Sequence, residues 1–242
     1  MARLQAHKYF YSAGRASRYR ANCDILVLKV HAGRCAACWS QHEHIFGARA
    51  LSAAAAAPGG PNNPALHARL RAATADAHAR LHLHPGFKAI QDGSITPAAY
   101  RALLARLLGF YLPFEAACGM DDERSAWLRA DLRALGAAHQ RIALCPAMPL
   151  LDGEAARLGA AYLAEGSLLG GRDLARKLDG LLGAGVIAGR RFFLGRGAAT
   201  GPGWQAFLAR LAAAYGDAPA AEASAVLMFG VFENWMEHWR GA

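Results

Sequence analysis

Apolar residues recur every three or four positions along most of the chain beyond residue 62, a spacing that predicts amphipathic helices. Helix start signals occur at Asn63-Pro64 and at Thr96-Pro97, where a capping side chain precedes a proline whose missing N–H donor is harmless. We expect the first helix to end at Pro85-Gly86, and the second to kink at Pro113 because proline removes a helical hydrogen bond.

Four more helices are expected further along the chain. The third follows Asp121-Asp122, and the fourth starts near Asp152 and runs into a glycine cluster. After a glycine-rich connection around residues 180 to 203, the last two helices have these apolar positions: Trp204, Phe207, Leu208 and Leu211, then Val226, Leu227, Phe229, Phe232, Trp235, Met236 and Trp239. Only 14 residues are Val, Ile or Thr, whereas Ala and Leu are abundant, so the predicted fold class is all-α.

The first 60 residues differ from the rest. We expect them to form a basic, disordered extension ending in an Ala/Pro/Gly linker, followed by one helical domain over residues 61–242. Of the formal net charge of +9, this extension carries +6, so the domain has an ordinary mixed surface. Neither nucleic acid nor a membrane is therefore an expected partner. Cys35, Cys38, His42 and His44 are zinc-type ligands, but the two pairs follow each other too closely to wrap a tetrahedral ion.

The run from Gly166 to Gly171 interrupts a segment of otherwise good helix formers. Each interior glycine costs about 1 kcal/mol relative to alanine, so the run needs a compensating role. Gly166 and Gly170 lie four residues apart, on one helical face. Two interpretations are open: the missing Cβ atoms admit close packing of another helix, or they let a flat ligand approach the main chain.

His78 follows Thr74 by one helical turn and Arg71 by about two turns on nearly the same face. This separation suits a metal at the centre of a planar macrocycle, with the imidazole on the metal and the guanidinium on an acidic group at the rim. His82, one turn after His78, permits another interpretation, a two-histidine metal site completed by a carboxylate such as Glu115.

Three stretches together carry a family resemblance: residues 70–78 with Leu81, residues 110–115, and residues 162–171. On these motifs the chain resembles haem oxygenases over about residues 64 to 240, and within them the bacterial biliverdin-producing enzymes that often accompany bacterial phytochromes. The resemblance implies a single-domain multi-helix bundle with a kinked, glycine-rich distal helix over the haem.

The resemblance also implies roles for individual residues. His78 is expected to be the proximal ligand of the haem iron, and Arg71 the basic partner of a haem propionate. On the distal side, Gly166, Ser167 and Gly170 are expected to be catalytic, and Gly166, Gly170 and Gly171 to bind the haem.

One position departs from the family pattern, because animal haem oxygenases carry an aspartate where this chain has Ser167. A serine hydroxyl can hydrogen-bond to water but cannot act as a carboxylate, so proton delivery must be arranged differently. The second propionate partner is expected, from position alone, at Arg210 or Arg190.

The function implied is oxidative cleavage of haem, which is both cofactor and substrate, to biliverdin, carbon monoxide and ferrous iron. Electrons are expected from an external donor such as a ferredoxin or a similar reductase, because no nicotinamide or flavin fingerprint follows a predicted strand. A redox partner protein is thus implied, and a bilin-binding photoreceptor is a candidate recipient of the product. The five cysteines, an odd number with no secretory leader before them, favour a cytoplasmic location.

Two rival functions are open. One is a carrier or sensor that binds haem on the same fold without degrading it, with Ser167 marking lost proton delivery. The other is a non-haem metal enzyme, or a thiamine-related helical enzyme, in which His78 and His82 serve other chemistry.

Overall fold

The computed structural model of the protein describes residues 64–138, 141–146, 148–239 and 241. The expected extension over residues 1–60, with its cysteine and histidine cluster, lies outside them. The described residues form helices and contain no strand, which confirms the all-α class. In chain order the elements are α2 (Pro64–His82), α3 (Pro85–Gln91), α4 (Pro97–Cys118), α5 (Glu123–Ala134), α6 (Gly153–Lys177), α7 (Asp179–Leu182), α8 (Arg191–Leu194), the 3-10 helix η1 (Gly197–Ala199), α9 (Thr200–Ala213), the 3-10 helix η2 (Tyr215–Asp217) and α10 (Ala218–Glu237).

The proline start signals agree with the structure. α4 begins at Pro97, and the Thr96 hydroxyl accepts a hydrogen bond from the Ala99 amide at 3.1 Å. α2 ends at His82 as expected, but Pro85 then opens a second short helix, α3, which the periodicity did not predict. The His84 ring caps α3 by accepting from the Gly86 amide at 3.2 Å, and seven residues are too few to show a helical repeat.

The N-terminus of α5 is capped by a residue from the preceding helix. Asp122 occupies the cap position but makes no capping hydrogen bond. Instead the buried Glu115 carboxylate accepts from the backbone N–H groups of Arg124 (2.7 Å) and Ser125 (3.2 Å) and from the Ser125 hydroxyl (2.6 Å). A carboxylate at this place also complements the positive end of the helix dipole, so Glu115 serves the fold.

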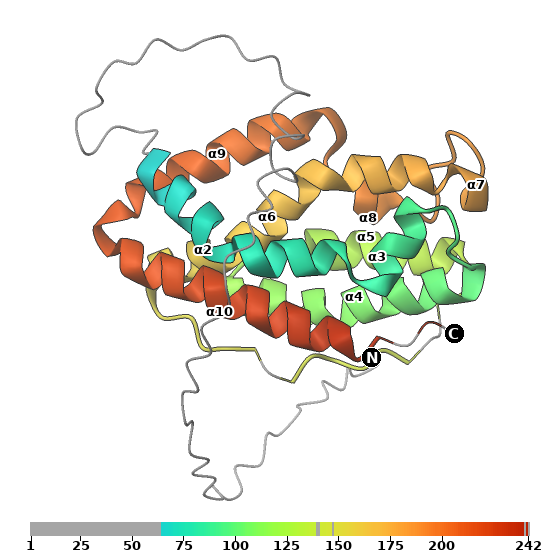
Figure 1. Ribbon diagram of the computed structural model, residues 1–242, viewed down its shortest axis with the longest axis horizontal. Coiled ribbons are helices and arrows are strands. Elements are labelled where there is room, and N and C mark those ends of the chain that lie inside the picture. Colours follow the sequence, from blue (N-terminus) through green and yellow to red (C-terminus); the bar gives the residue numbers. More distant parts are fainter. Residues whose placement is uncertain (1–63, 139–140, 147, 240, 242) are drawn as a thin grey trace, which may run out of the picture. The chain divides into compact units, whose positions relative to one another are not determined.

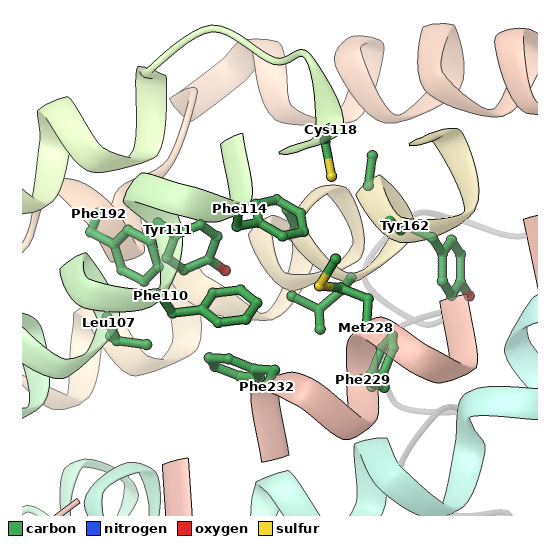
Figure 2. Packing of buried hydrophobic residues seen from close by; sticks show 14 of the residues in the cluster. Leu107, Phe110, Tyr111, Phe114, Cys118, Tyr162, Phe192, Met228, Phe229 and Phe232 are labelled. Atoms are coloured by element: carbon green, nitrogen blue, oxygen red, sulfur yellow. The ribbon is translucent and has the colours of Figure 1, made fainter. Parts of the chain in front are cut away.

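The helices that build the site are brought together by α10. Both α2 and α6 pack against α10, while α8 and α9 pack against α6 (Figure 1). In Figure 1 the α6 ribbon first rises obliquely and then runs level, so its two halves differ in direction. Side chains from α4 and α10 meet in the core, where the rings of Phe110 and Phe232 lie 4.6 Å apart between centroids (Figure 2).

Not every apolar position of α10 is buried. Val226 and Leu227 are 46% and 49% exposed, while Phe229 and Phe232 are buried. α10 is apolar over more of its circumference than one face needs, so the periodicity alone does not select the buried side. Across the described ranges, no helix combines the length and apolarity needed to cross a bilayer.

Asp131 of α5 holds the start of α8, which carries two phenylalanines of the core. Its buried carboxylate accepts from the backbone N–H groups of Arg191 (2.7 Å) and Phe192 (2.8 Å). Burial raises the pKa of the Asp131 carboxyl to about 6, although these hydrogen bonds and the Arg191 charge oppose the rise.

The raised pKa of Asp131 predicts a pH dependence of stability. Between about pH 4 and pH 6 the folded protein holds a proton that the unfolded chain has lost, so stability falls as the pH rises through this window. We expect Asp131→Asn to remove this dependence, and the free energy of unfolding of the wild type relative to the variant to fall by up to about 3 kcal/mol across it. Urea unfolding of both proteins at several pH values measures the difference, and parallel pH profiles would refute the prediction.

Candidate functional site

A cavity of about 490 Å³ lies between α2 and α6 and is closed by residues from α3, α4, α8 and α10. This volume is within the range of small-molecule sites. Most of its described lining is apolar and includes Leu81, Phe87, Leu107, Leu163, Phe192, Phe193, Phe229 and Phe232. The rings of Tyr111 and Phe192, which lie close together in Figure 2 with centroids 5.3 Å apart, form part of one wall.

Two histidines of α2 line the cavity. His78 and His82 are one turn apart, and their rings meet edge to face with centroids 4.5 Å apart and planes at 72°. The His78 ring also lies 6.5 Å from that of Phe229. Imidazole nitrogen is a ligand for iron and for other transition metals, so this side of the cavity can bind a metal.

The glycine run of α6 lines the same cavity. Gly166, Ser167, Gly170 and Gly171 all contribute to its lining, so the structure brings the predicted glycines and His78 to one cavity. A Cβ atom added at Gly166 would meet no described atom within 4 Å, which is what a residue facing open cavity space shows.

Gly171 serves the other interpretation of the glycine run. A Cβ atom there would lie 2.5 Å from the Phe193 carbonyl oxygen, closer than real contacts allow. The missing Cβ therefore lets α6 pack tightly against α8. Close packing of another helix therefore occurs at Gly171, whereas Gly166 has open space beside its main chain.

Two hydroxyl groups lie beside the glycine run. The Ser167 hydroxyl donates to the Ala164 carbonyl at 2.8 Å and lies near the Tyr111 phenol, whose pKa it influences. Burial raises the pKa of the Tyr111 phenol, and the charge of Arg124 together with the Ser167 hydrogen bond only partly offsets the rise. Tyr111 therefore stays a neutral hydroxyl that can donate or accept. The sequence motif contained Tyr111 but did not show that it faces Ser167.

Arg71 lies near one end of the cavity without lining it. Its charge acts on Tyr162, which does line the cavity, and on His67, whose ring is 5.9 Å from that of Tyr162. Burial raises the pKa of the Tyr162 phenol, and Arg71 opposes the rise. The buried Tyr162 hydroxyl has no hydrogen-bond partner within the described ranges.

The other two arginines named from the sequence lie elsewhere. Arg210, on α9, is exposed and 3.9 Å from Glu154, and it is not among the described lining residues. Arg190 is buried, and its guanidinium donates to Asp179 and to the carbonyl oxygens of Ala175 (2.6 Å) and Gly183 (2.6 Å). These contacts tie together the loop before α8, so Arg190 serves the fold. Lys177, which the sequence did not single out, does line the cavity.

The two-histidine site with Glu115 does not form. Glu115 caps α5 with both carboxylate oxygens, and within the described part of the chain no cluster of three or more His, Cys, Asp or Glu residues could hold a metal ion. Of the chemistries open to His78, a metal held by a single imidazole inside a larger ligand fits this environment best.

Comparison with known proteins agrees with this geometry. The sequence model of the family described as Heme oxygenase matches residues 64–237, which include α2, the glycine run and all of α10. A search of curated proteins finds no match for the chain. Because the family match spans well over half of the sequence, the chain belongs to the haem oxygenase family, whose members bind and degrade haem.

Proposed function

We propose that the protein is a haem oxygenase that cleaves haem to biliverdin, carbon monoxide and ferrous iron. One observation carries the proposal. His78, on α2, and the glycine run, on α6, line the same cavity. Bound haem supplies the iron that binds dioxygen, and its porphyrin ring is the substrate. The electrons come from an external donor, a ferredoxin or a similar reductase.

The residues present suit haem as a ligand. The lining is mostly apolar, as a porphyrin requires, and it offers imidazoles on one side. The open space beside Gly166 leaves room for a flat molecule against the main chain of α6. The positive charge of Arg71, which acts on the cavity residue Tyr162, suits a carboxylate at one end.

Each part of the cavity has a distinct role in this proposal. His78 holds the iron through a neutral ring nitrogen. Gly166 and Gly170 present main chain where other helices present side chains, so acidic and basic groups are kept off the reacting face. The phenylalanine walls exclude bulk water and leave the hydroxyl groups of Ser167 and Tyr111 to hold the water that delivers protons.

Proton delivery through this hydroxyl pair makes a testable prediction. We expect Ser167→Ala and Tyr111→Phe each to lower the rate of bilin formation by about 10- to 100-fold while haem still binds, because positioned proton donors contribute this much or more. Tyr100→Phe is the matched control, since the buried Tyr100 hydroxyl donates to the Gly189 carbonyl at 2.6 Å and Tyr100 is not a described lining residue. Turnover by Tyr111→Phe that equals turnover by Tyr100→Phe would exclude the phenol from proton delivery.

The placement of the haem carboxylates makes a second prediction. If they lie at the Arg71 end, Arg71→Ala weakens haem binding by about 10- to 100-fold, the value of one or two charge-assisted hydrogen bonds. Lys177→Ala, which removes the described cation in the cavity lining, should change the Kd less than about threefold. Haemin titration of both variants gives the two Kd values, and the opposite ranking would place the carboxylates at the Lys177 end.

Turnover of the ferric haem complex tests the proposed function. Incubation with ascorbate or with a ferredoxin reducing system should remove the Soret band and produce the spectrum of a bilin. A Soret band that persists for hours would instead identify a haem carrier or sensor. Ser167, in place of an aspartate, is the observation that favours this rival function.

The finer assignments follow from the same proposal. We propose that the protein belongs to the bacterial, phytochrome-associated branch of the family, since Ser167 stands where the animal enzymes carry an aspartate. A cytoplasmic location, a redox partner protein and a bilin-binding photoreceptor as recipient of the product belong to this assignment.

A further inference from the structure

A buried ion-pair network lies directly behind the glycine run. Glu165, the residue before Gly166, points its carboxylate away from the cavity, among the guanidinium groups of Arg124 and Arg196. Arg124 donates to it at 2.7 Å, and Arg196 donates to both of its oxygens at 2.8 and 3.1 Å. Arg196 also donates to Glu123 at 2.9 Å. One carboxylate of α6 is thus bound to α5 and to the segment between α8 and η1.

The network is buried, so breaking one of its ion pairs is costly. The Arg124 side chain is 1% exposed and that of Glu165 is 8% exposed, so neither charge has water to replace a lost partner. Burial alone would raise the pKa of Glu165, but Arg196 and Arg124 outweigh it and hold that pKa below its ordinary value. Glu165 therefore remains ionised and bound to both arginines at neutral pH.

The glycine run needs such an anchor. Its three glycines weaken the helix by about 1 kcal/mol each, and no side chain at Gly166 can pack against a neighbour. The backbone of this turn must be fixed by groups beside it. At its far end Gly171 packs against Phe193, and at its near end Glu165 is held by two arginines.

We propose that Glu165 is a positioning residue for haem cleavage: held by Arg124 and Arg196, it fixes the main chain of Gly166 to Gly171 over the cavity and keeps the Ser167 and Tyr111 hydroxyls aligned. The proposal rests on the proposed function of the cavity. Tyr111 connects the network to the cavity, because its phenol contacts Ser167 and lies within electrostatic range of Arg124, Glu115 and Glu165. A movement of Glu165 therefore changes the position of the Ser167 hydroxyl and the electrostatic environment of the Tyr111 phenol.

The first test needs no haem. We call the ion pairs of Glu165 with Arg124 and Arg196 the clamp. Amide hydrogen exchange of the full apo protein should be at least about tenfold faster in residues 166–171 for Glu165→Gln, because local opening becomes easier once the clamp is weakened. The control is Glu222→Gln on α10, which also breaks an arginine ion pair, with Arg69 at 2.6 Å, but at the surface. It should leave exchange at 166–171 unchanged.

The second test uses the haem-loaded protein and a quantity that a purely structural role would not move. The absorption spectrum of the ferric haem complex is recorded as a function of pH, and the midpoint of its change is compared. We expect this midpoint to shift by about half a pH unit or more in Glu165→Gln and not in Glu222→Gln, because the hydroxyl groups near the iron are rearranged. A lowered Tm with an unchanged midpoint would show that the network only stabilises the fold, and would overturn the proposal.

A neutral double variant keeps the proposal testable if Glu165→Gln does not fold. Arg124→Met with Glu165→Leu removes the two most buried charges of the network, and Arg196 keeps Glu123 as its partner at 2.9 Å, so no guanidinium is left without a carboxylate. It should fold, yet exchange faster at 166–171 and show the shifted midpoint. Wild-type exchange and a wild-type midpoint in the double variant would refute the positioning role. Failure of the wild-type protein to bind haemin would refute the proposed function instead, and the apo exchange would still report on the clamp.

Discussion

His78→Ala should lose the axial ligand of the haem iron and, with it, most of the haem affinity and all measurable bilin formation. We expect the Kd for haemin to rise by about 100-fold or more, which corresponds to roughly 3 kcal/mol of lost binding free energy. The variant should still fold, because His78 is only partly buried. Haemin titration with absorption spectroscopy measures both the affinity and the change in the spectrum.

Two controls make the assignment of His78 decisive. His82→Ala removes the neighbouring imidazole, whose ring centroid is 4.5 Å away, and should retain the axial ligand with a Kd within about tenfold of the wild type. Added imidazole should enter the space left in His78→Ala and restore a histidine-like spectrum. A wild-type spectrum in His78→Ala, together with its loss in His82→Ala, would assign the ligand to His82.

Substitution of the glycines should separate binding from folding. Gly166→Leu places a side chain into the cavity, where the first added atom meets no described atom within 4 Å. Leucine also has a helix propensity better than that of glycine by about 0.8 kcal/mol, so stability should stay level or rise. Haem affinity should nevertheless fall by about 100-fold or more, since the side chain occupies the place of the porphyrin.

Gly171→Ala should lower stability and leave haem affinity close to that of the wild type. Its Cβ atom would lie 2.5 Å from the Phe193 carbonyl oxygen, so α6 and α8 must separate, at a cost of about 1–3 kcal/mol in the free energy of unfolding. Urea unfolding and haemin titration of both glycine variants give the comparison. A destabilised Gly166→Leu that binds haem normally would mean that Gly166 faces packing and not ligand.

Much of the fold follows from local signals in the sequence. Thr96-Pro97 fixed the start of α4 because a cap and a proline act within one turn. Features that depend on tertiary contacts did not follow: Glu115 caps α5 from the preceding helix, and α3 is shorter than two turns. The sequence likewise does not show which apolar residues of α10 are exposed, because packing against α2 and α6 selects those that are buried.

Some of the site residues could also be predicted from the sequence and others could not. His78 and the glycine run belong to sequence motifs, and the structure brings both to one cavity. Arg210 was named from position along the chain, which cannot tell that α9 contributes no described residue to the cavity lining. The contact between Tyr111 and Ser167 depends on how α4 crosses α6, and the clamp on Glu165 joins residues 31 and 41 positions apart. No local pattern could reveal either.

A crystal structure of the haem-loaded protein tests the central claim most directly. We predict that a ring nitrogen of His78 is bound to the iron, that the main chain of Gly166 and Gly170 lies against the opposite face of the porphyrin, and that the carboxylates point towards Arg71. Haem bound outside the space between α2 and α6, or iron held by a residue other than His78, would contradict the account.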